Sequence, residues 1–337
     1  MNCQFPIYLY ALQTCFCNLT KNLISPEDET SRLSTRTLSR LEFLKLLTFI
    51  LIFSFVWAIV FRIPLRFASA TNQDPQARYF YTDKFGVKKI YPTKEMGREW
   101  FINMDDPMTD GVFDPQTELT RNADGTWRVG SADRDEGYNG RYHIVMNIDT
   151  PVGQIEWKDV EITGYFKAID VDESDDEEDN SSRLPVLQWY ARGNNHNSEI
   201  PCEGTSLKCR IYSDGHVGWV KEIWHDGGYT QERGISRPTG SIKGRWIGWK
   251  AVIYNIEGGK AVKMEGYLDD ASNNNWNKVT EVTDNGDWYS EEERFEEAEC
   301  NRPKNYVITN SGAKAAFRSD GVRWDFKSLS VREIRSE

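Results

Sequence analysis

Tyrosine, arginine and lysine side chains recur at alternate positions in several segments of this 337-residue chain. Alternate side chains of a β-strand point to opposite faces, so these segments have one apolar face and one polar face. The polar set comprises Gln188, Tyr190, Arg192, Lys208, Arg210, Tyr212, Lys250, Tyr254, Glu265 and Tyr267. Tyrosine rings cover the apolar faces of sugars, and arginine pairs with carboxylates through two hydrogen bonds. The polar face therefore predicts a groove for an acidic polysaccharide, and an ordinary solvent-facing sheet surface is the alternative.

The charge of the chain limits its partners. The formal net charge is −11, whereas basic stripes supply most of the affinity for nucleic acid. We therefore expect no nucleic-acid partner, and a polysaccharide or cell-surface glycan is the predicted one.

The first 70 residues predict export. Residues 43–61 form an apolar run with one charge, long enough to cross most of a bilayer as a helix. Basic residues in the leader 1–42 favour a cytoplasmic N-terminus. Ala68, Ser69 and Ala70 fit a signal-peptidase site. The segment is thus a cleaved signal or an uncleaved membrane anchor, with a buried core helix as a further alternative. We expect a protein that is secreted or membrane-anchored, with its C-terminal domain outside.

Three cysteines follow the apolar run, and none has zinc-finger spacing. Alternation places Cys209 with Leu207 and Ile211 on an apolar face, whereas Cys202 and Cys300 lie in polar segments. In an oxidising compartment this favours a Cys202–Cys300 disulfide with Cys209 buried and free. A bridge between Cys202 and Cys209 is the alternative.

Roughly a dozen alternating segments, separated by turn signals, follow residue 95. One of them covers Tyr306–Thr309, and a short acidic helix is expected over Glu291–Glu299. This pattern predicts an all-β jelly-roll sandwich over residues 95–335, preceded by an extension over 71–94.

Eight carboxylates crowd residues 170–180. We expect a solvated loop there, and calcium binding is the alternative, although the run lacks the glycine and closing glutamate of an EF-hand. No other cofactor and no metal ligand set is predicted.

Several segments carry a resemblance to a known superfamily. They are RGNNH at 192–196, CEG at 202–204, KEIWH at 221–225, GRWIGWKAVIYN at 244–255, VKMEGYLD at 262–269, FRSDG at 317–321 and SVREI at 330–334. Over 95–335 the chain resembles secreted concanavalin A-like jelly-roll proteins, which include lectin-like domains, glucanases and polysaccharide lyases. It is also similar to uncharacterised archaeal surface proteins.

The resemblance implies carbohydrate binding, and its enzymes suggest an alternative. Glucanases of this fold carry two glutamates on one strand, a motif that this chain lacks. Lyases of this fold use histidine and tyrosine as base and acid, roles that would fall to His196 or His225 and to Tyr190 or Tyr254. The lyase runs Arg-x-Glu-Leu-Arg and Gln-Ile-His are absent. We therefore expect a carbohydrate-binding protein, with a polysaccharide lyase or a structural cell-envelope protein as alternatives.

Overall fold

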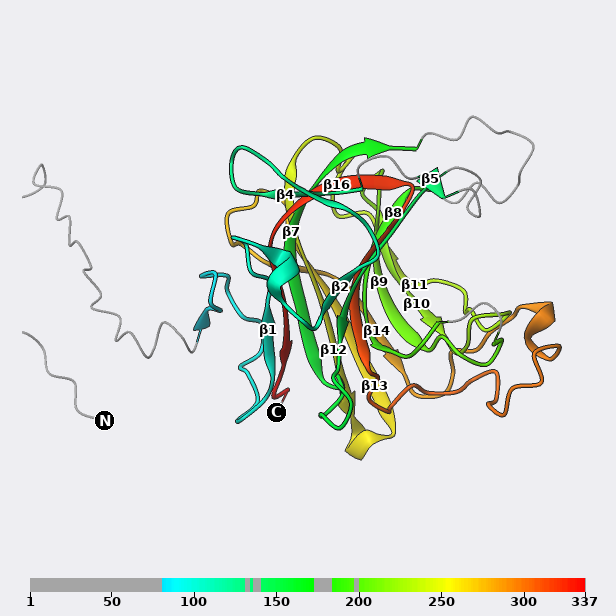
Figure 1. Cartoon of the computed structure of the whole chain (residues 1–337). Coiled ribbons are helices and arrows are strands. Elements are labelled where there is room, and N and C mark those ends of the chain that lie inside the picture. Colours follow the sequence, from blue (N-terminus) through cyan, green and yellow to red (C-terminus); the bar gives the residue numbers. More distant parts are fainter. Residues whose placement is uncertain (1–80, 131–133, 136–140, 173–183, 197–199, 337) are drawn as a thin grey trace, which may run out of the picture. The chain divides into compact units, whose positions relative to one another are not determined.

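The computed structural model describes residues 81–336, with gaps at 131–133, 136–140, 173–183 and 197–199 (Figure 1). The leader, the apolar run 43–61, the site at Ala70 and most of the acidic run lie outside the described residues. The chain divides into two units, Met1–Thr71 and Asn72–Glu337, and the fold described below is that of the second. Within the described residues, no helix is long and apolar enough to cross a membrane.

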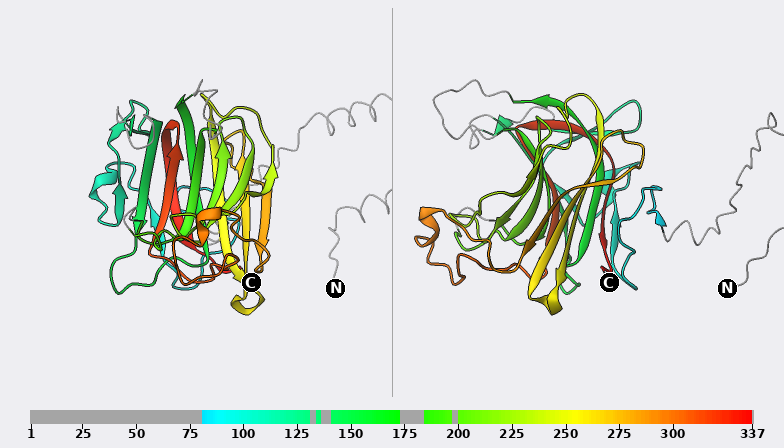
Figure 2. Two further views of the ribbon diagram at one scale, coloured as in Figure 1. Left: turned by 90° about the vertical axis from the view of Figure 1, so that its right-hand side faces the viewer. Right: turned by 180° about the vertical axis from the view of Figure 1, so that it is seen from behind.

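The second unit is a sandwich of two eight-stranded antiparallel sheets (Figure 2). The first sheet has the order β14 (Asn277–Asp284), β13 (Ala261–Asp269), β12 (Trp246–Ile256), β7 (Val160–Val171), β16 (Val322–Glu333), β4 (Trp127–Val129) and β3 (Leu119–Arg121), and β1 (Glu99–Phe101) also pairs with β16. The second sheet has the order β11 (Arg233–Ser236), β10 (Val217–Glu222), β9 (Ser206–Tyr212), β8 (Val186–Gly193), β15 (Lys314–Asp320), β6 (Arg141–Asp149) and β2 (Phe113–Pro115), and β5 (Arg134–Asp135) pairs with β6. The described residues add only short 3₁₀ turns at Pro107–Thr109, Glu257–Gly259 and Glu293–Phe295.

The core fills the space between the sheets, where apolar faces meet. Trp189 of the second sheet packs against Phe166 of the first, with ring centroids 6.4 Å apart. Gly164 permits this approach, because a Cβ atom there would lie 3.1 Å from Trp189 and 2.4 Å from Leu329. The predicted apolar face of Leu207, Cys209 and Ile211 is fully buried here. The prediction of an all-β two-sheet sandwich is confirmed.

Two local predictions are wrong. Tyr306–Thr309 forms no strand, because its carbonyl groups are used elsewhere: Lys221 Nζ donates to the Tyr306 oxygen at 2.9 Å, and Arg192 Nη1 donates to the Ile308 oxygen at 2.6 Å. In place of the acidic helix expected over Glu291–Glu299, the structure has only the single 3₁₀ turn Glu293–Phe295. The short strands β2, β3, β5 and β11 carry too little alternation to have been predicted.

The disulfide prediction is confirmed. Cys202 and Cys300 are bonded, with Cα atoms 5.4 Å apart. The bond joins the loop between β8 and β9 to the long connection that leads into β15. Cys209 is free and buried, as alternation predicts.

The N-terminal extension can be followed from residue 81, and it packs across the outer face of the first sheet. The Ile90 amide donates to Glu161 Oε2 on β7 at 3.0 Å, and Tyr91 Oη donates to Glu265 Oε2 on β13 at 3.0 Å. The outer face of the second sheet carries the candidate site.

Candidate functional site

A cavity of about 500 Å³ lies on the outer face of the second sheet, over β6, β8, β9, β10 and β15. We call it the Arg210 pocket. It is lined by Arg141, Tyr142, Leu184, Val186, Gln188, Lys208, Arg210, Tyr212, His216, Val220, Tyr229, Thr230, Glu292, Arg318, Asp320 and Gly321. Four predicted residues thus gather in it: Gln188, Lys208, Arg210 and Tyr212.

Strand register explains this gathering. Gln188 on β8 is paired with Arg318 on β15 and with Arg210 on β9, and Arg210 is paired with Gly218 on β10. Paired residues project from the same face, so the polar side chains form one row across the sheet. Gly218 ends the row without a side chain. Glu232 lies over this glycine, since a Cβ atom at 218 would lie 2.5 Å from its Oε1.

The Arg210 guanidinium is held in place by neutral groups. Its Nε donates to Gln188 Oε1 at 3.0 Å, and its Nη1 donates to Tyr212 Oη at 3.2 Å. Among the described residues, no carboxylate lies within 4.0 Å ion-pair distance of Arg210. The side chain is therefore oriented while much of its charge is left uncompensated.

Two carboxylates near the pocket differ in how readily they ionise, Asp320 on its lining and Glu232 close to Arg210. Although burial by itself raises the pKa of Asp320, Arg318 lowers it below the ordinary value, since its Nη2 lies 3.0 Å from Asp320 Oδ1. Burial raises the pKa of Glu232, against the opposing charge of Arg210. Glu232 Oε2 accepts a hydrogen bond from Tyr212 Oη at 3.0 Å. Asp320 is thus fixed as an anion, whereas ionisation of Glu232 is disfavoured.

An aromatic wall completes the pocket. The rings of Tyr212 and His216 are stacked, with centroids 3.8 Å apart and planes at 13°. His216 Nδ1 lies 2.6 Å from Asp214 Oδ1, which fixes the imidazole. A rigid, flat pair of rings of this kind suits the apolar face of a sugar.

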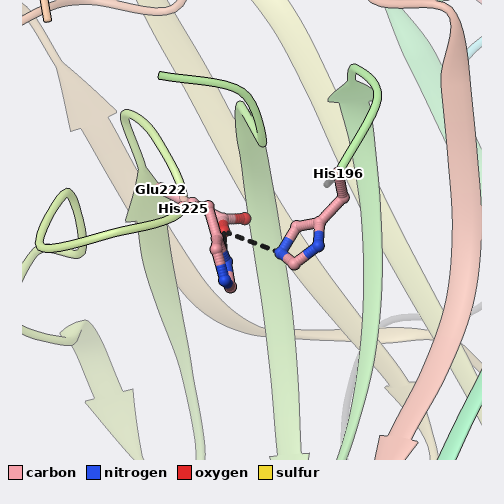
Figure 3. Close-up of side chains that lie close together, drawn as sticks. All are labelled: His196, Glu222 and His225. Atoms are coloured by element: carbon pink, nitrogen blue, oxygen red, sulfur yellow. Dashed lines mark ion pairs between the residues drawn. The ribbon is translucent and has the colours of Figure 1, made fainter. Parts of the chain in front are cut away.

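A second polar cluster adjoins the pocket at the ends of β8, β9 and β10. Glu222 is buried, and its Oε2 lies 2.8 Å from Lys208 Nζ and accepts from Ser206 Oγ at 2.6 Å. Its Oε1 lies 3.7 Å from His196 Nε2 and 3.9 Å from His225 Nδ1. Figure 3 shows these three side chains together, with His196 directed toward the carboxylate.

A glycine lets the two histidines meet. Gly204 has φ +83°, and a Cβ atom there would lie 3.1 Å from both His196 Cδ2 and His225 Cβ. The His225 amide donates to the Glu203 oxygen at 2.7 Å, and the Gly204 amide donates to the Asn195 oxygen at 2.9 Å. The imidazole centroids are consequently only 3.9 Å apart.

Burial sets the protonation of this cluster. It lowers the pKa of Lys208 to about 8, against the opposing effect of the Glu222 carboxylate. Although burial by itself raises the pKa of Glu222, the Lys208 ammonium holds it well below its usual value. Burial also lowers the pKa of His196. At neutral pH the lysine and glutamate form an ion pair, and His196 is neutral.

Arg192 does not face the pocket, which corrects the prediction from alternation. It adopts φ 58° and its side chain is fully buried. The pairing of β8 with β15 shifts register here, between Lys314 and Ala316. The irregularity ends the alternation. Arg192 then donates to carbonyl oxygens of Lys158 and Ile308, at 2.9 and 2.6 Å.

Lys250, Tyr254, Glu265 and Tyr267 also lie away from the pocket, because β12 and β13 belong to the first sheet. Their outer face is covered by the extension. Lys250 is buried with Nζ 2.8 Å from Glu161 Oε1, Tyr254 Oη lies 3.1 Å from Tyr91 Oη, and Tyr267 Oη donates to Glu265. The expectation of one groove formed by all ten residues is therefore wrong. Each sheet has its own polar outer face.

Tyr190 is half-buried beside the pocket, with its ring centroid 5.7 Å from Lys208 Nζ. Burial raises its pKa to about 12. Sequence reasoning missed Tyr229, whose hydroxyl accepts from Lys208 Nζ at 2.9 Å, because it lies outside the regular strands. It also missed Arg318 and Asp320, although alternation along β15 places both on one face.

No protein-family model matches the chain, and no curated protein matches it. Among solved structures, the fold is similar to peanut lectin at 9% identity and TM-score 0.37, covering 72% of this chain and 100% of that one. Lotus tetragonolobus seed lectin has 12% identity, TM-score 0.38 and coverage of 72% and 100%. A Bacillus subtilis protein of unknown function with a galectin-like fold has 10% identity, TM-score 0.42 and coverage of 71% and 100%. At these TM-scores the similarities carry no functional assignment.

Proposed function

We propose that this protein binds acidic polysaccharide in the Arg210 pocket. The observation that carries the proposal is the Arg210 guanidinium, which Gln188 and Tyr212 orient from two sides. None of the described carboxylates pairs with it. An oriented, unpaired guanidinium in a cavity is suited to bidentate pairing with a uronic-acid carboxylate.

The size and walls of the pocket fit a segment of a sugar chain. Its volume of about 500 Å³ falls within the range of small-ligand sites, roughly 300–1,000 Å³. The stacked rings of Tyr212 and His216 offer an apolar platform, and the Arg210 guanidinium offers hydrogen-bond donors on the same lining. A pyranose needs this combination, because it has apolar faces and a polar rim.

The charge of the lining favours an acidic ligand. Four lining residues are basic, namely Arg141, Lys208, Arg210 and Arg318, and Glu292 and Asp320 are acidic. Lys208 is paired with Glu222, and Arg318 is paired with Asp320. The lining nevertheless retains a small excess of positive charge, against a chain charge of −11. Such a patch attracts anionic ligands and weakens as salt rises.

Isothermal titration calorimetry with oligogalacturonate tests the proposal. Wild-type protein should bind the acid form and lose affinity when the carboxylates are methyl-esterified. Arg210→Met should weaken binding roughly tenfold or more, since a hydrogen-bonded charge pair contributes about 1.5–3 kcal/mol. Arg121→Met, which alters an exposed arginine on β3 of the other sheet, should bind like wild type. Equal binding by the Arg210 and Arg121 variants would rule out the pocket. If no oligouronate binds, acidic-sugar recognition is wrong.

A polysaccharide lyase is the second candidate, favoured by the surroundings of Lys208. His196 and His225 meet at Glu222, which pairs with this lysine, and the Tyr190 and Tyr229 ring centroids lie 5.7 and 4.7 Å from its Nζ. A neutral histidine can accept the proton next to a uronic-acid carboxylate, and a tyrosine can donate one to the leaving oxygen. Incubation with polyuronate should then produce unsaturated sugars that absorb in the ultraviolet. Absence of such a product, with binding intact, would leave only the binding function.

We propose further that the second unit lies outside the cytoplasm, secreted or held by residues 43–61. The Cys202–Cys300 disulfide supports this location, because such bonds persist in oxidising compartments. If the second unit is anchored at the cell surface, protease treatment of intact source cells should remove it. If it is secreted, it should be present in the culture medium. Full protection until the cells are lysed would contradict the proposal.

A further inference from the structure

We propose that His196, Glu222 and His225 bind a divalent transition metal ion of the zinc type. The inference rests on the geometry of these three side chains and does not depend on the proposed sugar binding. Their candidate ligand atoms all lie within 4.8 Å of one another. Two imidazoles and one carboxylate are a donor set that zinc accepts, with a further position left for water.

The spacing is close to that of a coordinated site. Ligand atoms that lie about 2.0–2.2 Å from a tetrahedral zinc ion are roughly 3.3–3.6 Å apart. Glu222 Oε1 lies 3.7 Å from His196 Nε2 and 3.9 Å from His225 Nδ1. These distances are too long for hydrogen bonds. A contraction of a few tenths of an ångström would bring both glutamate–histidine pairs into this range. The two imidazole nitrogens, which lie within 4.8 Å of each other, would approach one another as the ion binds.

The same atoms lack partners, which is the independent sign of a ligand. Glu222 Oε1 and His225 Nδ1 are buried and have no hydrogen-bond partner, and Glu222 is only 2% exposed. A buried, unpaired carboxylate oxygen is costly, so its persistence requires an explanation. One cation between the three groups would satisfy both atoms at once.

The surroundings hold the carboxylate for monodentate binding. Lys208 and Ser206 both contact Glu222 Oε2, at 2.8 and 2.6 Å, which leaves Oε1 for the ion. Partners of this kind orient metal ligands. The Lys208 ammonium also offsets the glutamate charge, which disfavours calcium and magnesium, because these ions bind mainly to carboxylates and other oxygens. Zinc, cobalt, nickel and copper retain the affinity that imidazole provides.

Cobalt(II) titration monitored by visible absorption tests the site directly. The full chain, in detergent and without a histidine tag, should develop d–d bands that zinc then displaces. His196→Ala and His225→Ala should each weaken cobalt affinity by more than about 100-fold, because loss of a residue that only supports a metal ligand costs roughly 10–100-fold. His143→Ala, on β6, serves as the histidine control and should titrate like wild type. Cysteines before residue 43 contribute equally to all variants, so the difference spectra report the site.

The metal-binding experiment can be interpreted independently of the sugar-binding experiment. Near-ultraviolet circular dichroism of each variant establishes that it is folded. The same d–d bands in His225→Ala and in wild type, or no bands in wild type, would overturn the proposed site. Oligogalacturonate binding measured before and after chelation reports on the Arg210 pocket alone, so either proposal can fail while the other stands.

Discussion

Arg192 and Arg210 look equivalent in the sequence, and their different surroundings lead to opposite expectations for substitution. Arg192→Met keeps the apolar stem and removes the buried guanidinium. Two carbonyl acceptors, of Lys158 and Ile308, then lose their donor. An unsatisfied buried acceptor costs about 1–3 kcal/mol. The side chains of Asn255 and Asp159 lose Arg192 as well.

We therefore expect Arg192→Met to lower the free energy of unfolding by about 3–5 kcal/mol, because two carbonyl acceptors are left unsatisfied at about 1–3 kcal/mol each. The loss of Asp159 as a partner adds little, because its side chain is 35% exposed. Arg210→Met removes two hydrogen bonds in a half-exposed pocket and should lower the free energy of unfolding by about 1 kcal/mol. Urea titration followed by tryptophan fluorescence measures both changes. Under conditions where the Arg192 variant is folded, its affinity for oligogalacturonate should equal that of the wild-type protein.

The opposite pair of results would contradict these assignments of Arg192 and Arg210. An Arg192 variant with a stability loss below about 1 kcal/mol and no sugar binding would mean that alternation continues through the end of β8. Arg192 would then face the ligand, and the irregular pairing with β15 would be wrong.

Three further perturbations test other parts of the fold. Replacing both Cys202 and Cys300 by Ala opens a loop of sequence separation 98, and should lower the free energy of unfolding by up to about 5 kcal/mol; a loss below about 1 kcal/mol in urea would contradict this. Glu232→Gln should stabilise the protein near pH 7 and have little effect near pH 4. The pKa of this glutamate is raised on folding, so stability falls as pH rises through it, and the amide avoids that cost; unfolding curves at both pH values measure the change, and a destabilised variant at pH 7 would refute it. Lys250→Met should lower the free energy of unfolding by about 3 kcal/mol and leave sugar binding unchanged, because Lys250 pairs with buried Glu161 under the extension. Calorimetric melting measures the stability and calorimetric titration measures the binding, and loss of binding would show that the first sheet also contacts the ligand.

Much of the sandwich could be predicted because alternation is a local property. Whether a residue belongs to an apolar or a polar face depends only on its neighbours in the strand. That is why alternation correctly places Cys209 in the core, and why excluding Cys209 identifies the disulfide pair. At Arg192, an irregular pairing with a distant strand ends the alternation, and the neighbouring residues no longer indicate which way the side chain points.

Sheet membership could not be predicted, because it depends on pairing between strands far apart in the sequence. Arg210 and Lys250 both occupy polar positions flanked by apolar ones, yet their strands belong to different sheets. The histidine cluster is non-local as well. Gly204 brings His196 against His225, and Glu222 precedes His225 by three residues, a spacing that in a strand and turn has no fixed meaning.

The basic residues on the two outer faces differ in the groups that contact them, and this difference distinguishes a structural role from a binding role. On the first sheet, Lys250 and Arg332 each approach Glu161 to 2.8 Å, and all three are buried. Because these groups are buried and contact one another, they are not accessible to a ligand. On the second sheet, Arg210 is oriented by an amide and a hydroxyl, which position its guanidinium without neutralising it. Orientation without neutralisation costs folding stability, and an anionic ligand would recover that cost on binding. This asymmetry, which residue composition does not reveal, is the physical reason to look for the ligand on the second sheet.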